Sequence, residues 1–430
     1  MICLYIDPGT GSMLFSIVIT LVTMLYFVGK KAIIKLKFVL SGGKAVAGSK
    51  TRYPFVIYSE SARYWTVFKP IVDEFEGRGI DVLYYTATED DPFFSEGYKH
   101  ITGEAIGEGN KAFTRLNFLE ADVCLMTTPG LDVYQLKRSR GVKHYSHIMH
   151  SVDDATSYRL FGLDYYDAVL LSGEYQKSHL RLLEEQRGIQ KKDLEVVGCP
   201  YLDTLQEKVV QMGLLSSSVS ADTDKLTVLV APSWGSNGIL VKYGERLLDP
   251  LVETGFTVIV RPHPQSLTSE KDVLDRLQKR YRDNALLEWD FSRENLISLS
   301  RSNIMISDFS GVIFDYTFLF DRPFLYVHSD FDDRPYDAGD IEEEPWKFRV
   351  LPKIGIELKE SDFSNLKQVL TDACSDAVLS ENRQRAKDTA WQHRGESGKR
   401  VVDYLVAKQK ELAEGSELKN VGDAHVDSAL

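Results

Sequence analysis

Two basic side chains stand where a phosphate group would need them. The motif Arg261-Pro262-His263-Pro264 closes the apolar run 256–260, and its prolines restrict the backbone, so a guanidinium and an imidazole are held at the end of a predicted strand. Arg261 can place two N–H groups on phosphate oxygens. His263 can donate to a pyrophosphate or protonate a leaving phosphate. The motif therefore predicts a site for a phosphorylated ligand.

A second phosphate-binding element is predicted over residues 303–320. A β-branched run there ends at Ser307 and passes through Asp308, Ser310 and Gly311 into an amphipathic segment. Asp and Ser are common helix N-caps, glycine lets a ligand approach the backbone closely, and helix starts at strand ends bind phosphate in α/β folds. The alternative is that Asp308 and Ser310 only cap a core helix.

A third strand end supplies the turn 232–238, which contains Ser233 and Trp234. Its glycines and serines make a flexible turn with backbone donors beside an aromatic face. The turn fits a ligand site and a plain loop equally well.

Three histidines at a spacing of three, His144, His147 and His150, mark the first half of the chain. On a helix they would share one face and indicate a metal site. No His-Glu-x-x-His or comparable motif accompanies them, so we predict no metal, and the β-prone residues around them predict a strand that delivers His150 to its end. There His150 can act as general base toward an acceptor hydroxyl, with Asp153 or Asp154 to orient it. The alternative is a set of loop histidines without a role.

The elements that must position these residues follow an α/β rhythm. From residue 53 onward short apolar runs alternate with amphipathic stretches, and the rhythm restarts near residue 226 after a segment rich in Ser and Asp. This pattern predicts parallel sheets covered by helices. We expect an N-terminal Rossmann-like domain over 50–212, a linker over 213–225, a C-terminal Rossmann-like domain over 226–410 that faces the first across a cleft, and a disordered tail over 411–430.

One membrane segment is expected near the N-terminus. Residues 12–29 carry no charge, which is about the length that a helix needs to cross a bilayer, and four lysines follow within residues 30–37. Positive charge marks the cytoplasmic side. We therefore expect residues 1–45 to form an anchor with a basic juxtamembrane helix, single-pass or peripheral, at the cell membrane with the catalytic domains in the cytoplasm. A cleaved signal peptide is the competing interpretation, but its charges would precede the apolar run.

Charge and cysteine usage exclude other classes of protein. The formal net charge of −12 leaves no global basic field for nucleic acid, so any phosphate site has to be local. The four cysteines are widely spread and contain no Cys-x-x-Cys pair, which indicates neither a zinc cluster nor a disulfide framework.

Taken together and in this order, the motifs resemble those of the CDP-glycerol glycerophosphotransferase family, the teichoic acid polymerases and primases of the bacterial cell envelope. The resemblance covers roughly residues 140–405. It is carried in the first half by His150, Gly162, Asp167 and Ser172, and in the second half by residues 231–233, 261–264, 307–315, 322–326 and 395–400.

Three positions depart from the family pattern. Ser151 replaces a glycine, and Tyr158 or Arg159 stands where lysine is usual. Gly311 replaces the second serine of the later motif. The first two departures lie in the motif attributed to the acceptor, so acceptor recognition is where this chain is expected to differ.

The resemblance implies a GT-B architecture, no metal or other cofactor, and attack of an acceptor hydroxyl on the β-phosphate of a CDP-linked polyol with CMP leaving. His150 would take the hydroxyl proton, while His263, Arg261 and the helix start at Ser310 and Gly311 would neutralise charge on the pyrophosphate. Ser233, Ser307 and Asp308 would complete the donor site. Asp315 would either bind the polyol hydroxyls or fix the helix.

The expected function is transfer of glycerol phosphate, or another phosphopolyol, to a lipid-linked or polymeric acceptor in teichoic acid or capsule synthesis. One alternative is a GT-B glycosyltransferase that uses a sugar nucleotide, which the identity of the released nucleotide would distinguish. Another is a membrane-tethered binding protein without catalysis, which the altered Ser151 and missing lysine favour. Retention of both His150 and His263 argues against it.

Overall fold

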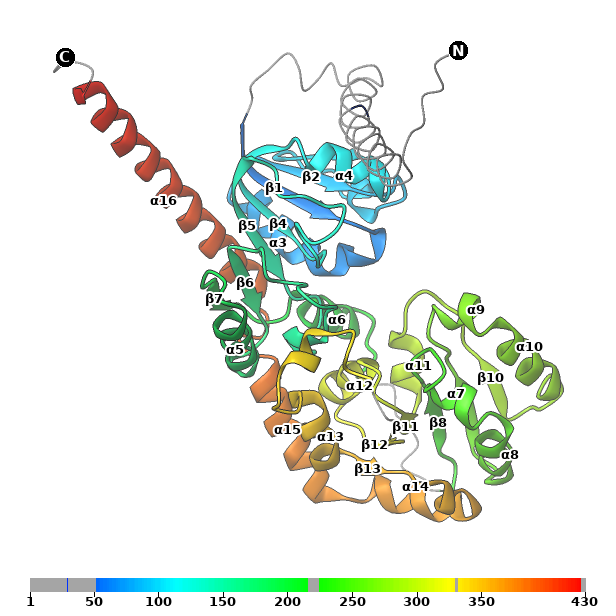
Figure 1. Cartoon of the computed structure of the whole chain (residues 1–430). Coiled ribbons are helices and arrows are strands. Elements are labelled where there is room, and N and C mark those ends of the chain that lie inside the picture. The colour runs from blue at the N-terminus through cyan, green and yellow to red at the C-terminus, as the bar shows by residue number, and fades with distance from the viewer. Residues whose placement is uncertain (1–28, 30–51, 216–223, 329–331, 427–430) are drawn as a thin grey trace, which may run out of the picture.

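The computed structural model describes residue 29 and residues 52–215, 224–328 and 332–426 (Figure 1). Apart from Gly29, the anchor predicted over 1–45 lies outside the described residues, as does most of the predicted linker. Within the described ranges no helix is both long enough and apolar enough to cross a bilayer.

The first domain is built on a seven-stranded parallel sheet in the order β3-β2-β1-β4-β5-β6-β7. Most of its strand residues are buried from both sides, as expected where helices cover both faces of a parallel sheet. The strands are β1 (Tyr53–Ser59), β2 (Val82–Thr86), β3 (Ile101–Ala105), β4 (Glu120–Met126), β5 (Gly141–Ile148), β6 (Ala168–Leu171) and β7 (Asp193–Val196). The helices are α3 (Trp65–Gly77), α4 (Asn110–Leu116), α5 (Lys177–Arg187) and α6 (Pro200–Gln211).

The second domain repeats the plan with a six-stranded parallel sheet in the order β10-β9-β8-β11-β12-β13. Its strands are β8 (Thr227–Val230), β9 (Thr257–Val260), β10 (Leu287–Trp289), β11 (Ile304–Ser307), β12 (Phe324–Tyr326) and β13 (Ile356–Glu357). Its helices are α7 (Ile239–Lys242), α8 (Glu245–Glu253), α9 (Ser266–Ser269), α10 (Lys271–Arg280), α11 (Leu296–Arg301), α12 (Val312–Phe320), α13 (Trp346–Ile354), α14 (Leu366–Cys374) and α15 (Ala377–Ala390). Two parallel sheets covered by helices confirm the predicted α/β class.

The last helix, α16 (Ser397–Val426), leaves the second domain and packs on α3 of the first (Figure 1). Val401, Val402 and Leu405 are buried in the same core as the apolar face of α3. Gly398 permits the close approach, because a Cβ there would lie 2.3 Å from the carbonyl oxygen of Pro70. We expected residues up to 410 to belong to the second domain and the tail beyond them to be disordered. The chain instead returns to the first domain at Ser397, and the helix anchored by this packing extends to Val426.

An interdomain clasp joins residues 153–162 and Arg187 to residues 335–347. The buried carboxylate of Asp337 accepts hydrogen bonds from the backbone N–H groups of Phe161 (2.7 Å) and Gly162 (3.3 Å), and Arg187 lies 2.7 Å away. A second contact lies closer to His150, where the carboxylate of Asp153 pairs with Nζ of Lys347 at 2.9 Å. The loop that carries His150 is therefore held by both domains.

Candidate active site

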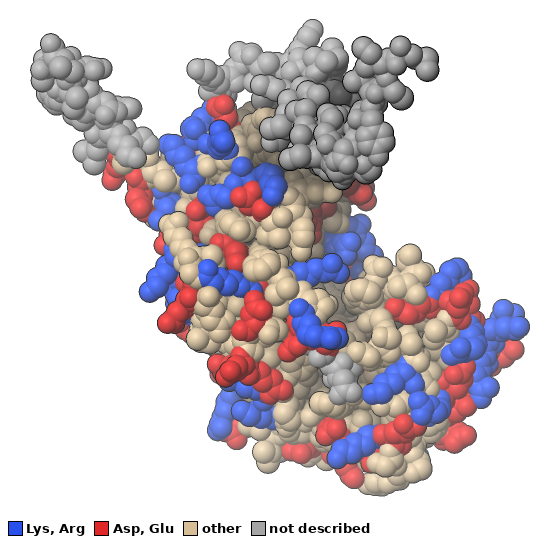
Figure 2. All heavy atoms as spheres, in the orientation of Figure 1, with Lys and Arg blue, Asp and Glu red and all other residues tan. Residues whose placement is uncertain are grey.

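Both sheets present loops at a point where the strand order reverses. In the first sheet β1 lies between β2 and β4, and in the second β8 lies between β9 and β11. Crevices at the carboxyl ends of such strands are the usual ligand sites of open α/β sheets. Figure 2 shows the surface hollowed where the two domains meet.

His150 lies two residues beyond β5, which confirms the predicted strand that delivers it to a strand end. Its Nδ1 lies 3.2 Å from the hydroxyl of Thr127, at the end of β4, and 3.1 Å from the hydroxyl of Tyr158. With Nδ1 engaged, Nε2 is the nitrogen left for a substrate. Burial lowers the pKa of His150, Asp153 raises it in part and Arg63 lowers it further, so the imidazole is neutral at pH 7, as a general base must be.

Tyr158 connects His150 to a second buried histidine. The same hydroxyl lies 3.1 Å from Nε2 of His147. Burial lowers the pKa of His147 well below its usual value, and its Nδ1 has no hydrogen-bond partner among the residues that the structure describes. His144, in contrast, contacts the hydroxyl of Tyr404 on α16 at 3.2 Å. The three histidines of the sequence motif therefore do not converge on one point.

His263 follows β9, where the sequence places it. Its Nδ1 accepts a hydrogen bond from the backbone N–H of Gln265 at 3.1 Å, so the ring proton of the neutral form is on Nε2. Burial lowers the pKa of His263, with Glu270 raising it in part and Arg63 lowering it further. The ring of Trp234, from the turn after β8, lies with its centroid 6.4 Å away. His263 is thus a neutral donor beside an aromatic surface.

Arg261 stands at the predicted strand end, but its guanidinium is already engaged. Nη1 lies 2.5 Å from the carboxylate of Asp290 and 3.1 Å from the hydroxyl of Ser292, whose carbonyl accepts from Nη2 at 2.8 Å. Burial alone would raise the pKa of Asp290, but hydrogen bonds from Ser292, Ser298 and Arg261 lower it to about 2. The ion pair therefore persists at neutral pH, and a phosphate would have to compete with Asp290 for Arg261.

Asp308 connects two loops through hydrogen bonds and does not cap α12. Its carboxylate accepts hydrogen bonds from the backbone N–H groups of Ser233 (2.9 and 3.1 Å), of Ser310 (3.2 Å) and of the first residue of α7 (3.2 Å). Burial raises the pKa of Asp308, although these donors lower it in part. Helix α12 has Gly311 at its N-cap position and no side-chain cap. The prediction that Asp308 and Ser310 cap it is wrong, because the loop after β8 takes up the carboxylate.

The other residues between β11 and α12 differ in burial. Ser307 is buried, and its hydroxyl donates to the carbonyl of Ala231 at 2.6 Å, so it fastens β11 to the end of β8. Ser310 is half-buried and Gly311 is exposed. A Cβ at Gly311 would have no neighbour within 4 Å, which leaves room for a ligand at the start of α12.

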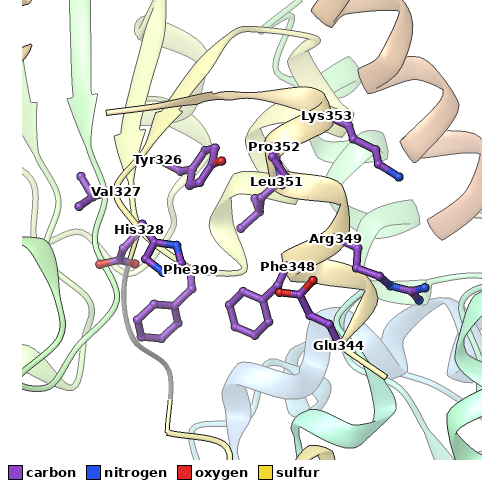
Figure 3. A pocket seen from close by; sticks show the side chains of 11 residues that line it. Phe309, Tyr326, Val327, His328, Glu344, Phe348, Arg349, Leu351, Pro352 and Lys353 are labelled. Carbon is purple, nitrogen blue, oxygen red and sulfur yellow. The ribbon is translucent and has the colours of Figure 1, made fainter. Parts of the chain in front are cut away.

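A pocket of about 440 Å³ opens beside this loop. Figure 3 shows aromatic rings around it from three elements: Phe309 of the loop, Tyr326 of β12 and Phe348 of α13. Asp308 and Glu344 add carboxylates to its lining. The pocket lies between the Asp308 loop, the end of β12 and α13.

Asp315 lies one turn into α12 and is buried. Its carboxylate accepts hydrogen bonds from the hydroxyl of Tyr201 on α6 (2.9 Å) and from the amide of Asn295 (3.3 Å). Burial raises the pKa of Asp315 to about 7, although the two donors lower it in part. These contacts favour the interpretation that Asp315 fixes the helix over the one in which it binds polyol hydroxyls.

Arg63 is a site residue that the sequence analysis missed. It follows β1 in the short helix η1 (Ala62–Tyr64), and it is exposed. Its charge lowers the pKa of both His150 and His263, so it lies within electrostatic reach of a histidine from each domain. Among the described residues it has no carboxylate partner; its Nε contacts the hydroxyl of Ser61 at 3.3 Å. Its place just after the apolar run 53–59 is the only sequence signal for it, and the reversal of strand order at that point is visible only in the structure.

The sequence model of a family described as CDP-glycerol:poly(glycerophosphate) glycerophosphotransferase matches residues 144–406. That span contains His150, His263 and the Asp308 loop, and it excludes Arg63 and Thr127. No curated protein matches the sequence.

Among solved structures, the fold is similar to that of the wall teichoic acid polymerase TagF, which is 15% identical over 84% of this chain and 90% of that one, with a TM-score of 0.52. A putative UDP-N-acetylglucosamine 2-epimerase from Listeria monocytogenes is 12% identical over 84% of this chain and 98% of its own, with a TM-score of 0.52. The UDP-GlcNAc 2-epimerase of Methanocaldococcus jannaschii is 15% identical over 83% and 100%, with a TM-score of 0.50. At these identities the likeness concerns the fold alone, which is of the GT-B type.

Proposed function

The chain belongs to the CDP-glycerol:poly(glycerophosphate) glycerophosphotransferase family, and we propose that it transfers glycerol phosphate, or another phosphopolyol, from a CDP-linked donor to a membrane-associated acceptor. The product would be an envelope polymer such as teichoic acid. The observation that carries the proposal is a pair of neutral histidines on strand ends of opposite domains, His150 and His263, both within reach of the charge of Arg63. One can accept a proton through Nε2, and the other can donate one through Nε2.

In the proposed reaction the acceptor hydroxyl attacks the β-phosphorus of the donor. Nε2 of His150 takes the hydroxyl proton as the new O–P bond forms, and the bond from the β-phosphorus to the bridging oxygen breaks. CMP leaves with that electron pair, and the Nε2–H of His263 donates to the oxygen on which negative charge develops. The proton on His150 then passes to water, which restores the base.

Fixed donors near the pyrophosphate support this assignment. The exposed start of α12 at Gly311 offers backbone N–H groups, and Arg63 adds a full positive charge from the other domain. Groups that are already in place when charge develops commonly contribute more to such catalysis than any other effect. The pocket between the Asp308 loop and α13 offers space for a further part of the donor.

We also propose that the enzyme works at the cytoplasmic face of the cell membrane. The support is the uncharged run 12–29 followed by four lysines, the pattern of an anchor whose C-terminal side faces the cytoplasm. A lipid-linked or polymeric acceptor would reach His150 from that surface.

The test is release of CMP from CDP-glycerol and CDP-ribitol by membranes that contain the full chain, with a lipid-linked acceptor. His150→Gln and His263→Gln are each expected to lower the rate by about 10²- to 10⁴-fold. His100→Gln is the matched control, because His100 is a half-buried histidine of the first domain whose ring contacts Asp81, at 3.1 Å, and it is expected to keep full activity.

Each outcome decides between the candidate functions. Loss of CMP release in both site variants with one donor establishes the transferase and identifies the polyol. Release of UDP or GDP from a sugar nucleotide, with no CMP from either CDP donor, would instead establish a glycosyltransferase on the same fold. Binding of donor without any turnover would favour a non-catalytic role.

A further inference from the structure

The hydroxyl of Tyr158 stands between two histidines and can serve only one of them as donor. It lies 3.1 Å from Nδ1 of His150 and 3.1 Å from Nε2 of His147. A phenol carries one proton, so when it donates to one ring nitrogen it can only accept from the other. The direction of this single proton is therefore linked to the proton positions on both rings.

Two arrangements are open to neutral histidines. If Tyr158 donates to His147, its oxygen accepts Nδ1–H from His150, and Nε2 of His150 is bare and can act as a base. If Tyr158 donates to His150, the proton of His150 is on Nε2, and His150 cannot take a proton from an acceptor hydroxyl there. The tautomer of His150 thus depends on whether His147 attracts the phenolic proton.

His147 is suited to this task because it cannot easily become charged. It is fully buried on β5, and its only hydrogen-bond partner among the described residues is Tyr158. A positive charge would be costly there, so the ring remains neutral, and with its proton on Nδ1 it can offer Nε2 as an acceptor. Thr127, which lies 3.2 Å from Nδ1 of His150, can accept Nδ1–H or donate to Nδ1 and so imposes neither tautomer.

We infer that Tyr158 and His147 are positioning residues for the transfer reaction: His147 draws the phenolic proton, and Tyr158 thereby holds His150 in the tautomer with a free Nε2. This inference rests on the proposed function of His150 as general base. It gives a role to Tyr158, which, with Arg159, is one of the two residues at which the family resemblance places a lysine. In this inference both residues act through His150, to which Tyr158 is hydrogen-bonded directly and His147 through Tyr158.

The inference predicts a specific order of kcat among the variants. In His147→Phe the phenolic proton loses its acceptor on His147, and the remaining acceptors are Nδ1 of His150 and the hydroxyl of Thr127. Donation to the more basic Nδ1 keeps the proton of His150 on Nε2, so kcat is expected to fall about 10²-fold. Tyr158→Phe removes the competing donor and leaves Thr127 beside Nδ1, so a fall of only about 10-fold is expected. The double variant is expected to be as active as Tyr158→Phe, that is, about 10-fold more active than His147→Phe. His147→Gln, whose amide oxygen can accept the phenolic proton, is expected to recover part of the loss.

The KM of the donor is expected to stay within about twofold in all of these variants, because no donor contact changes. His144→Gln is the matched control for a buried histidine of β5 that lies outside the chain of hydrogen bonds, and it is expected to keep kcat. A double variant no more active than His147→Phe would overturn the inference, since simple loss of packing would make the two changes add.

A second readout separates this inference from the proposed function. Full-length protein with ¹⁵N-labelled histidine reports by NMR which ring nitrogen of His150 is protonated, and His150→Gln identifies the signal. The expected result is a bare Nε2 in the wild type and a protonated Nε2 in His147→Phe. If no phosphopolyol is transferred but the tautomer switches, the proposed function fails and the hydrogen-bond chain stands. If transfer occurs and the tautomer is the same in both proteins, the inference fails.

Discussion

Asp154 of the first domain caps a helix of the second: its carboxylate accepts the backbone N–H of Lys347 at 2.9 Å, and that of the preceding residue at 2.9 Å. The N-cap residue of α13 itself, Pro345, makes no side-chain hydrogen bond. The free N–H groups at the start of α13 are therefore hydrogen-bonded by the segment that follows His150. This contact links the position of His150 to that of the second domain.

Replacing Asp154 should affect both stability and turnover. Asp154→Ala leaves the first N–H groups of α13 without an acceptor, and we expect a loss of about 1–2 kcal/mol in unfolding free energy. Because the same residue holds the His150 loop, kcat should also fall, by about 10-fold. The control is Asp376→Ala, which removes the comparable cap of α15 (3.0 and 3.2 Å) at a distance from both histidines in sequence and fold. Equal kcat in the two variants, at equal loss of stability, would contradict the coupling.

Arg63 should contribute to donor binding and to the pH profile. In Arg63→Gln we expect the donor KM to rise about 10-fold, because one charge–phosphate contact is lost. The charge of Arg63 lowers the pKa of His150 and His263, so its removal raises both. More of His150 is then protonated at pH 6, and the acidic limb of kcat should move to higher pH while the rate at pH 8 changes less. Arg140→Gln, the same change at an exposed arginine before β5, should alter neither quantity.

Asp315 should make the protein less stable as the pH rises from about 4 to 7. The pKa of Asp315 is about 7 in the folded protein and about 3.9 in an unfolded chain. Between these values the unfolded state has released a proton that the folded state retains, so raising the pH favours unfolding, by at most about 4 kcal/mol. Asp315→Asn keeps an oxygen for Tyr201 and Asn295 but cannot ionise. Its Tm relative to the wild type should therefore rise by several degrees from pH 5 to pH 8, and an equal difference at both pH values would refute the assignment.

Gly311 offers a test that separates folding from binding. A Cβ at this position meets no atom within 4 Å, and the backbone φ of −60° is ordinary for alanine. Gly311→Ala should therefore leave Tm unchanged or slightly raised, while its methyl group obstructs a phosphate at the start of α12 and raises the donor KM about 10-fold or more. Gly77→Ala, at another open helical glycine, should change neither Tm nor KM appreciably. Unchanged donor affinity in Gly311→Ala would place the phosphate elsewhere.

The sequence predicted the parts of this structure that follow from local patterns. Runs of apolar and β-branched residues identified both sheets, and β5 places His150 at a strand end as expected. Such local patterns do not predict contacts between segments that are far apart in the sequence. A carboxylate before a helix usually caps that helix, but Asp308 instead accepts a hydrogen bond from the backbone N–H of Ser233. In the same way, the guanidinium of Arg261 is paired with the carboxylate of Asp290.

The roles of Arg63, Tyr158 and His147 were missed in the sequence analysis for the same reason. Arg63 is a single arginine in an unremarkable segment, and only the order of strands shows that it lies where the sheet reverses. Tyr158 and His147 are eleven residues apart, and their contact requires the loop after β5 to fold back on its own strand. The sequence could indicate that His150 is a base, but not that the hydroxyl of Tyr158 determines which of its ring nitrogens carries the proton.

The return of α16 to the first domain has a consequence for biosynthesis. Val401, Val402 and Leu405 complete a core whose other members lie between Phe55 and Val197. While the chain emerges from the ribosome, that apolar face of α3 stays uncovered until more than 200 further residues have been made. The first domain can reach its final packing only after Val401, Val402 and Leu405 have been made. A premature stop before Ser397 would therefore damage the half of the enzyme that was already synthesised.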